Sequence, residues 1–303
     1  MMSDIRFQSD PEQEDAYSIL PVWRRLSALL LIMTGALLAV VLLSELLQLR
    51  FDARIERVLS VALAPLILLA WLIIAVLPEY QAARPRRRLI GVAVLSALTA
   101  SAIGLPLTED FLRVEEWLPL QSVFQRIVGY TLSAGLVDTG LKFIVLRYLI
   151  YPQGLRVRSD AVAYALASAM GYGAFLSLAL VWRLEPTLGI AAIYVLATLT
   201  IQLASAMFIA LGIIESYFSD AYPLVLPLNV AVAALASGII SALLGGFLSG
   251  PLSTAGNAAR PLFACAMLVA ALIVTFGTVY FLYSNSERRE REAYMSQWNT
   301  DGI

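Results

Sequence analysis

Residues 188–214 read LGIAAIYVLATLTIQLASAMFIALGII, an apolar stretch that contains no charged side chain. A helix needs about 20 predominantly apolar residues to cross the hydrocarbon core of a bilayer, so this stretch predicts one membrane crossing. Hydrocarbon offers the backbone no hydrogen-bond partners, so such stretches are expected to be helices. Seven further apolar stretches pass the same threshold, at 26–48, 58–77, 89–107, 127–150, 161–182, 224–248 and 261–283.

The composition agrees with eight spans. Of the 303 residues, 60% are hydrophobic and 14% are charged, whereas globular proteins average about half and about a quarter. Eight spans of roughly 22 residues need about 176 positions, and 60% of 303 is about 182. The sequence therefore predicts an all-α, polytopic integral membrane protein. About eight transmembrane helices form one bundle over 26–283, between an N-terminal tail at 1–25 and a C-terminal tail at 284–303.

The arginines predict the orientation, because basic residues collect on the cytoplasmic side of membrane proteins. With the N-terminus inside, twelve arginines fall on the cytoplasmic side and six on the other. The twelve are Arg24, Arg25, Arg84, Arg86, Arg87, Arg88, Arg147, Arg156, Arg158, Arg288, Arg289 and Arg291; the six are Arg50, Arg54, Arg57, Arg113, Arg183 and Arg260. We therefore expect both tails to be cytosolic and the protein to lie in the cytoplasmic (inner) membrane of a bacterium.

Histidine is absent from the chain, and Cys265 is its only cysteine. These counts exclude an imidazole base, a histidine-ligated metal and an internal disulfide. We expect no metal site and no cofactor, and we interpret Cys265 as a small apolar packing residue. The net charge of −1 creates no field that attracts nucleic acid. The expected partners are the lipid bilayer and the transmembrane helices of other membrane proteins.

Asp138 and Lys142, the only lysine, lie inside the apolar stretch 127–150. An ionisable residue at the bilayer centre costs at least ~2.5–3.5 kcal/mol, so its presence calls for a specific reason. The four-residue spacing places both on one helical face and predicts an ion pair within the helix. Two interpretations remain open: a functional site that faces the bundle interior, or a structural pair that fixes helix packing. Gln202 is expected to hydrogen-bond to another helix.

Three short motifs follow one another in the segment 134–182: Asp138-Thr139-Gly140-Leu141-Lys142, Asp160-Ala161-Val162-Ala163-Tyr164-Ala165 and Gly171-Tyr172-Gly173. Their order and spacing resemble the core of the PrsW family of intramembrane proteases, relatives of the CAAX-protease and bacteriocin-processing group. In that family a Glu-Glu-x-x-Lys helix precedes Asp-Gly-x-x-Tyr-Gly, and Gly-Phe-Ala then leads to a Glu-Asn pair. Later helices supply histidines.

The resemblance implies a PrsW-like core at about 127–250. It makes Asp138 and Lys142 the remnant of the catalytic motif. It assigns the binding of a substrate or partner to Asp160, Tyr164, Gly171 and Gly173. The two glycines are also expected to be points of close approach for a neighbouring helix.

The departures from the family pattern concern the catalytic groups. Asp138 is the only counterpart of the glutamate pair, since Thr139 stands at the other position. The next glutamate falls on Phe175 or Leu176, and the histidines have no counterpart. Hydrolysis in a bilayer needs a water activated by a metal or by paired carboxylates. We therefore expect a PrsW-like multi-pass protein without protease activity, acting as a membrane-embedded binding or regulatory protein or as an accessory subunit of a membrane complex.

Two other functions stay open. The first is an active PrsW-type intramembrane protease in which Asp138 works with a second carboxylate such as Glu215. A second acid within about 5 Å of Asp138 would favour this function. The second is a small-solute transporter, although the sequence shows no inverted repeat and few candidate helix breaks, at Pro65, Pro223 and Pro227.

Overall fold

The computed structural model describes residues 19–46, 51–80, 86–118, 121–150, 154–218, 222, 224–248, 263–282 and 284, with the backbone alone at 19–26, 45–46, 115 and 245–248. These residues form helices and short connections, and no strand occurs among them. The predicted all-α class is confirmed. The tails that we predict at 1–25 and 284–303 lie almost wholly outside the described residues.

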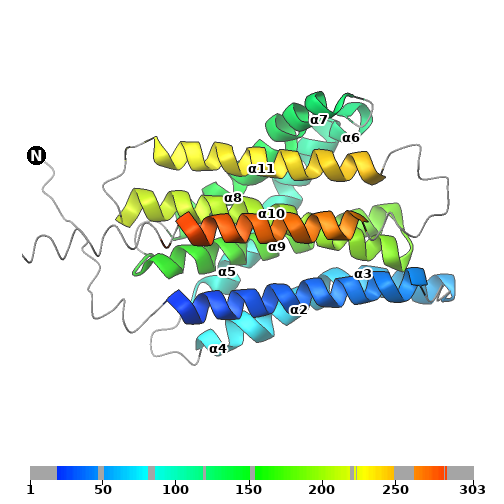
Figure 1. Cartoon of the computed structure of the whole chain (residues 1–303), viewed down its shortest axis with the longest axis horizontal. Helices are drawn as coiled ribbons and strands as arrows, with labels where there is room; N and C mark the ends of the chain where they lie inside the picture. Colours follow the sequence, from blue (N-terminus) through cyan, green and yellow to red (C-terminus); the bar gives the residue numbers. More distant parts are fainter. Residues whose placement is uncertain are drawn as a thin grey trace, which may run out of the picture.

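Among the described residues, most helices are α-helical and four segments are π-helical. The α-helices are α2 (Ile19–Leu46), α3 (Ala53–Trp71), α4 (Leu77–Tyr80), α5 (Leu89–Thr99), α6 (Val114–Trp117), α7 (Val123–Tyr130), α8 (Leu136–Leu149), α9 (Arg158–Leu184), α10 (Leu188–Phe218) and α11 (Val225–Leu248), followed by a C-terminal helix (Phe263–Leu282). The π-helical segments are η1 (Leu72–Val76), η2 (Ala100–Gly104), η3 (Pro106–Phe111) and η5 (Thr131–Gly135). The long helices lie side by side along one direction, and α6 and α7 lie at the edge of the bundle beside α11 (Figure 1).

Seven helices in the described part of the chain are long and apolar enough to cross a membrane. They begin and end at Ser27–Ser44, Ala53–Tyr80, Leu89–Phe111, Arg158–Leu184, Leu188–Phe218, Val225–Leu244 and Phe263–Leu282. Seven of the eight apolar stretches in the sequence correspond to these helices, which is the pattern of a multi-pass membrane protein. The most buried of them are α9 and α10, which form the centre of the bundle.

The eighth stretch, 127–150, is helical but is not among these seven. The chain is helical from 123 to 149, through α7, the π-helical η5 and α8. Asp138, Lys142 and Arg147 all lie in α8, and their charges lower the hydropathy of this segment.

The segments that begin with α5 and α9 run parallel to each other. Three side-chain contacts follow in the same order along both, namely Arg86–Asp160, Ser96–Ser168 and Glu109–Arg183. We call the two ends of the bundle the Arg86 end and the Arg183 end. Arg88 donates from Nη1 to the carbonyl oxygen of Leu149 at 2.6 Å, so α8 ends at the Arg86 end. The chain between the two parallel segments therefore returns from the Arg183 end to the Arg86 end.

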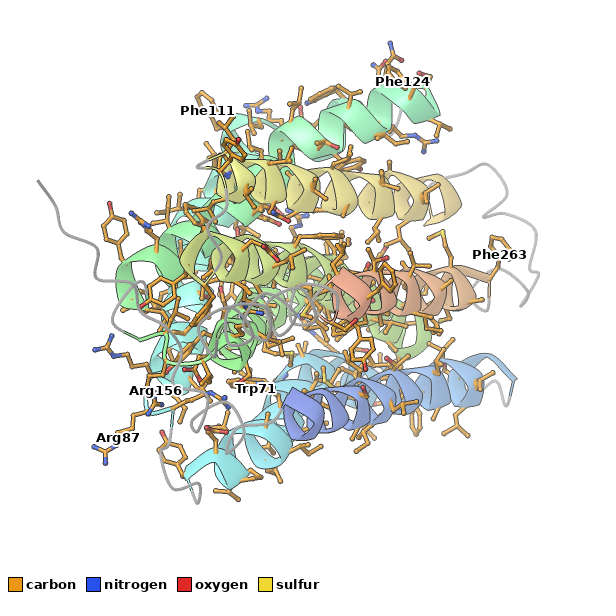
Figure 2. The ribbon with its side chains drawn as sticks, turned by 60° about the vertical axis from the view of Figure 1, so that its left-hand side comes forward. Trp71, Arg87, Phe111, Phe124, Arg156 and Phe263 are labelled. Carbon is orange, nitrogen blue, oxygen red and sulfur yellow. The ribbon has the colours of Figure 1, made fainter. Side chains whose placement is uncertain are left out.

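Charged side chains gather at both ends of the bundle. Arg87 and Arg156 project from the same end, beside the buried Arg86 (Figure 2). At the opposite end, Arg183 pairs with Glu109 and Arg57 pairs with Glu185. The described arginines of each predicted side of the membrane thus lie together at one end.

Candidate functional site

Five polar side chains from three helices form one network inside the bundle. Asp138 accepts a hydrogen bond from the Tyr172 hydroxyl on Oδ1 at 2.7 Å and one from Gln202 Nε2 on Oδ2 at 2.8 Å. Lys142 donates from Nζ to Oε1 and to the main-chain oxygen of Gln202, at 2.5 and 3.3 Å, and to the Ser205 hydroxyl. We call these five residues the core network.

The prediction of a direct ion pair between Asp138 and Lys142 is wrong. The Gln202 amide lies between them, since its Nε2 donates to the acid and its Oε1 accepts from the base. The four-residue spacing does place both side chains on one face of α8, as expected, but that face meets α10. The prediction that Gln202 hydrogen-bonds to another helix is confirmed.

The hydrogen-bonding capacity of the core network is largely used. An ammonium group has three N–H donors, and Lys142 contacts three acceptors while its side chain is fully buried. Asp138 is 7% exposed and has a partner on each carboxylate oxygen. A fully satisfied buried polar network rigidifies a core. The geometry therefore favours the structural interpretation of Asp138 and Lys142.

A glycine makes room for the Tyr172 hydroxyl. A Cβ atom at Gly104, at the end of η2, would lie 2.2 Å from the oxygen of Tyr172. Only a residue without a side chain lets this hydroxyl reach Asp138 at the observed distance. Tyr172 lies inside the Gly171-Tyr172-Gly173 motif, for which the family resemblance implies no role of the tyrosine. Its place between two glycines is the signal in the sequence that could have indicated it.

Among the residues that the structure describes, Asp138 has no second carboxylate as a hydrogen-bond partner. Glu215 lies on α10, thirteen residues after Gln202, which corresponds to roughly 20 Å along a helix. The structure thus does not bring Glu215 to Asp138. Within the described part of the chain, no group of three or more acidic or cysteine side chains could hold a metal ion.

Lys142 also contacts Ser205, and a serine beside a lysine can act as a nucleophile with the lysine as its base. Here Ser205 directs its hydroxyl at the carbonyl oxygen of Gln202, at 3.0 Å, while Lys142 donates to the same hydroxyl. Ser205 is 1% exposed and Lys142 is not exposed at all. Both side chains are thus buried and hydrogen-bonded within the bundle, and the pair forms part of the core network.

A second buried charge cluster lies at the Arg86 end. Arg86 donates from Nε to Asp160 Oδ1 at 2.6 Å, from Nη1 to Glu79 Oε2 at 3.1 Å, and from Nη2 to the Ser159 hydroxyl at 3.0 Å. The other oxygen of Asp160 accepts from the main-chain N–H groups of Arg156 and Val157, at 2.9 and 3.1 Å. Asp160 lies in the first turn of α9, a preferred place for an acid, and its carboxylate binds the two N–H groups that directly precede the helix.

The environment of Arg86 keeps it charged. Burial alone would lower the pKa of its guanidinium, but the carboxylates of Asp160 and Glu79 outweigh burial and raise the pKa above its ordinary value. Arg86 is 5% exposed and Glu79 is 6% exposed. In the sequence Arg86 belongs to a basic cluster that is expected on the cytoplasmic side, and no local pattern indicates its burial.

The two motif glycines contact helices of the same chain. A Cβ atom at Gly171 would lie 1.9 Å from the main-chain oxygen of Ala93 on α5, and one at Gly173 would lie 3.1 Å from Leu199 on α10. The expected close approach of neighbouring helices is thus confirmed. Tyr164, like Asp160, is buried. These four residues, which the resemblance assigns to a substrate or partner, lie inside the bundle.

Cys265 is buried in the apolar core, as predicted. No family model, curated protein or solved structure matches the chain.

Proposed function

We propose that the chain is a PrsW-like multi-pass protein of a bacterial cytoplasmic membrane that has no protease activity. In this proposal it acts as a membrane-embedded binding or regulatory protein, or as an accessory subunit of a membrane complex. The single observation that carries the proposal is the core network, in which Gln202 joins Asp138 to Lys142 in place of a second acid.

Protease chemistry in this fold would need a water held between activating groups. The described partners of the Asp138 carboxylate are a phenol and an amide, and neither group is an acid or a base at neutral pH. The alternative, an active PrsW-type protease using Asp138 with a second carboxylate, lacks support from the position of Glu215.

The direction of the helices supports eight membrane crossings. The chain must return between the parallel segments of α5 and α9, and the helical run 123–149 makes this return. An even number of crossings puts both tails on one side. The arginine distribution supports the cytoplasm as that side.

Site-directed labelling tests the topology. In a Cys265→Ala background, Arg87→Cys and Glu116→Cys place single exposed thiols at opposite ends of the bundle. We expect a membrane-impermeant maleimide to label Glu116→Cys in intact cells and Arg87→Cys only after the cells are broken. The reverse pattern would contradict the orientation, and labelling of both in intact cells would contradict the opposite placement of the two ends.

A combined assay tests the function. Purification in a mild detergent followed by mass spectrometry should recover a second membrane protein in a fixed ratio to the chain. The same preparation should not cleave single-span membrane substrates. Cleavage that Asp138→Asn abolishes would overturn the proposal, and so would a chain that purifies from native membranes without any partner. Gly140→Ala, which meets no atom within 4 Å, is the matched control on α8.

A further inference from the structure

An open groove of about 580 Å³ lies between α3, α9 and the segment η2–η3 near the Arg183 end. Its wall is apolar and includes Val61, Pro65, Leu105, Phe175 and Ala179. Phe175 is one of the two positions where the PrsW pattern has a glutamate. The groove follows α9 inward from Arg183 to Phe175, eight residues or roughly 12 Å of helix.

One acidic and one basic side chain line the groove, and a second ion pair lies close to it. Arg183 pairs with Glu109, and both residues line the groove. Arg57 pairs with Glu185 and also lies 5.5 Å from the ring centre of Trp182, which lines the groove as well. These residues lie within about a turn of the ends of candidate spans. Tryptophan and arginine at such positions are typical of the level of lipid headgroups.

We propose that this groove binds a phospholipid whose headgroup carries a phosphate and a primary ammonium. One acyl chain lies against the apolar wall, the phosphate contacts the guanidinium of Arg183, and the ammonium donates to the carboxylate of Glu109. A guanidinium has five N–H donors and a carboxylate has about four acceptor sites, so the two residues can keep their own ion pair. This inference does not depend on the PrsW-like function.

The mixed charge of the mouth selects this headgroup. An anionic headgroup without an amine would meet Arg183 but would offer no cation to Glu109. A trimethylammonium headgroup has the charge but no N–H donor. It therefore cannot form the charge-assisted hydrogen bond to Glu109, which is the stronger kind of hydrogen bond. The exposed fractions of the Arg183 and Glu109 side chains, 40% and 26%, leave both within reach of a ligand.

The size of the groove favours an acyl chain over a partner helix. A helix with its side chains has a diameter of ~10–12 Å and rises 1.5 Å per residue, so a volume of this size takes up roughly one turn. A spanning helix needs about 20 residues. An extended hydrocarbon chain, in contrast, follows the full length of the wall.

Lipid titration followed by native mass spectrometry tests the proposal. The purified full-length protein is titrated with phosphatidylethanolamine, phosphatidylcholine and phosphatidylglycerol of identical acyl chains. We expect phosphatidylethanolamine to bind about tenfold more tightly than the other two, because one additional charge-assisted hydrogen bond contributes about 1.4 kcal/mol. Equal retention of the three lipids, or retention of none, would overturn the proposal whatever the variants show.

Two kinds of variant test whether the lipid binds in this groove. Glu109→Gln should abolish the preference for phosphatidylethanolamine over phosphatidylcholine, whereas Glu116→Gln, at an exposed pair with Arg113 outside the groove, should keep it. Ala179→Phe should weaken all three lipids at least about tenfold by filling the groove, and Val61→Phe is the second filling variant should the first not fold. Binding as in the unmodified protein by a folded filling variant would contradict the site.

Discussion

Gln202 donates a hydrogen bond to Asp138 across the interface of α10 and α8, with 2.8 Å between Nε2 and Oδ2. The opposite side of the same amide accepts from Lys142. One neutral side chain thus separates the two charges of α8 and ties both to a helix about sixty residues further along the chain. Within the core network, the two opposite charges therefore compensate each other through Gln202 rather than in direct contact.

The replacement of Lys142 by Met should destabilise the protein strongly. It removes the cation and leaves the buried carboxylate of Asp138 without a compensating charge, which costs about 3–5 kcal/mol in comparable buried sites. Thermal melting in detergent measures the loss. A Lys142→Met variant that melts at the temperature of the unmodified protein would contradict the buried position of these charges.

The same network predicts how the loss can be recovered. Asp138→Leu combined with Lys142→Met removes both charges but leaves the Gln202 amide without its partners, and an unsatisfied buried polar group costs about 1–3 kcal/mol. The triple variant with Gln202→Leu should therefore melt at a higher temperature than the double variant. Equal melting of the two would mean that Gln202 has no bridging role.

The spacing of residues predicts which side chains share a helical face, but not which helix that face meets. Asp138 and Lys142 lie on one face as expected, yet their partners come from α9 and α10, and no local pattern specifies such contacts. Gln202 could be predicted as an interhelical hydrogen-bonder because an amide inside an apolar stretch needs a partner. Hydropathy alone predicts the seven helices that are long and apolar enough to cross a membrane. The segment 127–150 departs from this pattern because the residues of the candidate site lower its hydropathy.

The burial of Arg86 shows a second limit of sequence analysis. Four arginines lie close together at 84–88, and their charge predicts that all of them lie at the membrane surface. Of the three that the structure describes, Arg86 is buried and Arg87 and Arg88 are exposed, because Asp160 and Glu79 converge on Arg86 from two other segments. Charge placement thus predicts the end of the bundle, whereas packing decides which arginine is buried there.

Gly104 and Tyr172 should be energetically coupled. In Gly104→Ala the new methyl group would lie 2.2 Å from the Tyr172 oxygen, so the ring must move and its hydrogen bond to Asp138 is lost. Overpacking of this kind costs about 1–3 kcal/mol. In a Tyr172→Phe background the clashing oxygen is absent, and the same alanine should cost less by about 0.5 kcal/mol or more. A double-mutant cycle by thermal melting checks this, and strictly additive losses would contradict the contact.

Arg86→Met should destabilise the protein by about 3–5 kcal/mol, because it removes the buried cation that pairs with both Asp160 and Glu79. The raised pKa of Arg86 gives the pH dependence. A cation whose pKa is higher in the folded than in the unfolded state stabilises the folded state fully at any pH below its pKa in the unfolded state. This stabilisation is lost only as the pH rises through its pKa in the folded state. For an arginine both values lie above the range of a melting experiment. The difference in melting temperature between Arg86→Met and the unmodified protein should therefore be equal at about pH 8 and about pH 10.

Gly171→Ala and Gly140→Ala should have opposite effects on stability, although both introduce one methyl group into a helix. At Gly171 the methyl carbon would lie 1.9 Å from the main-chain oxygen of Ala93, and a backbone atom cannot turn away as a side chain can. The two helices must separate, so we expect a loss of at least about 2 kcal/mol. At Gly140 the methyl carbon meets no atom within 4 Å, and alanine in a helix interior is favoured over glycine by roughly 0.5–1 kcal/mol. Thermal melting of both variants in one detergent measures the contrast, and a Gly171→Ala protein as stable as Gly140→Ala would show that α5 and α9 do not approach each other at this glycine.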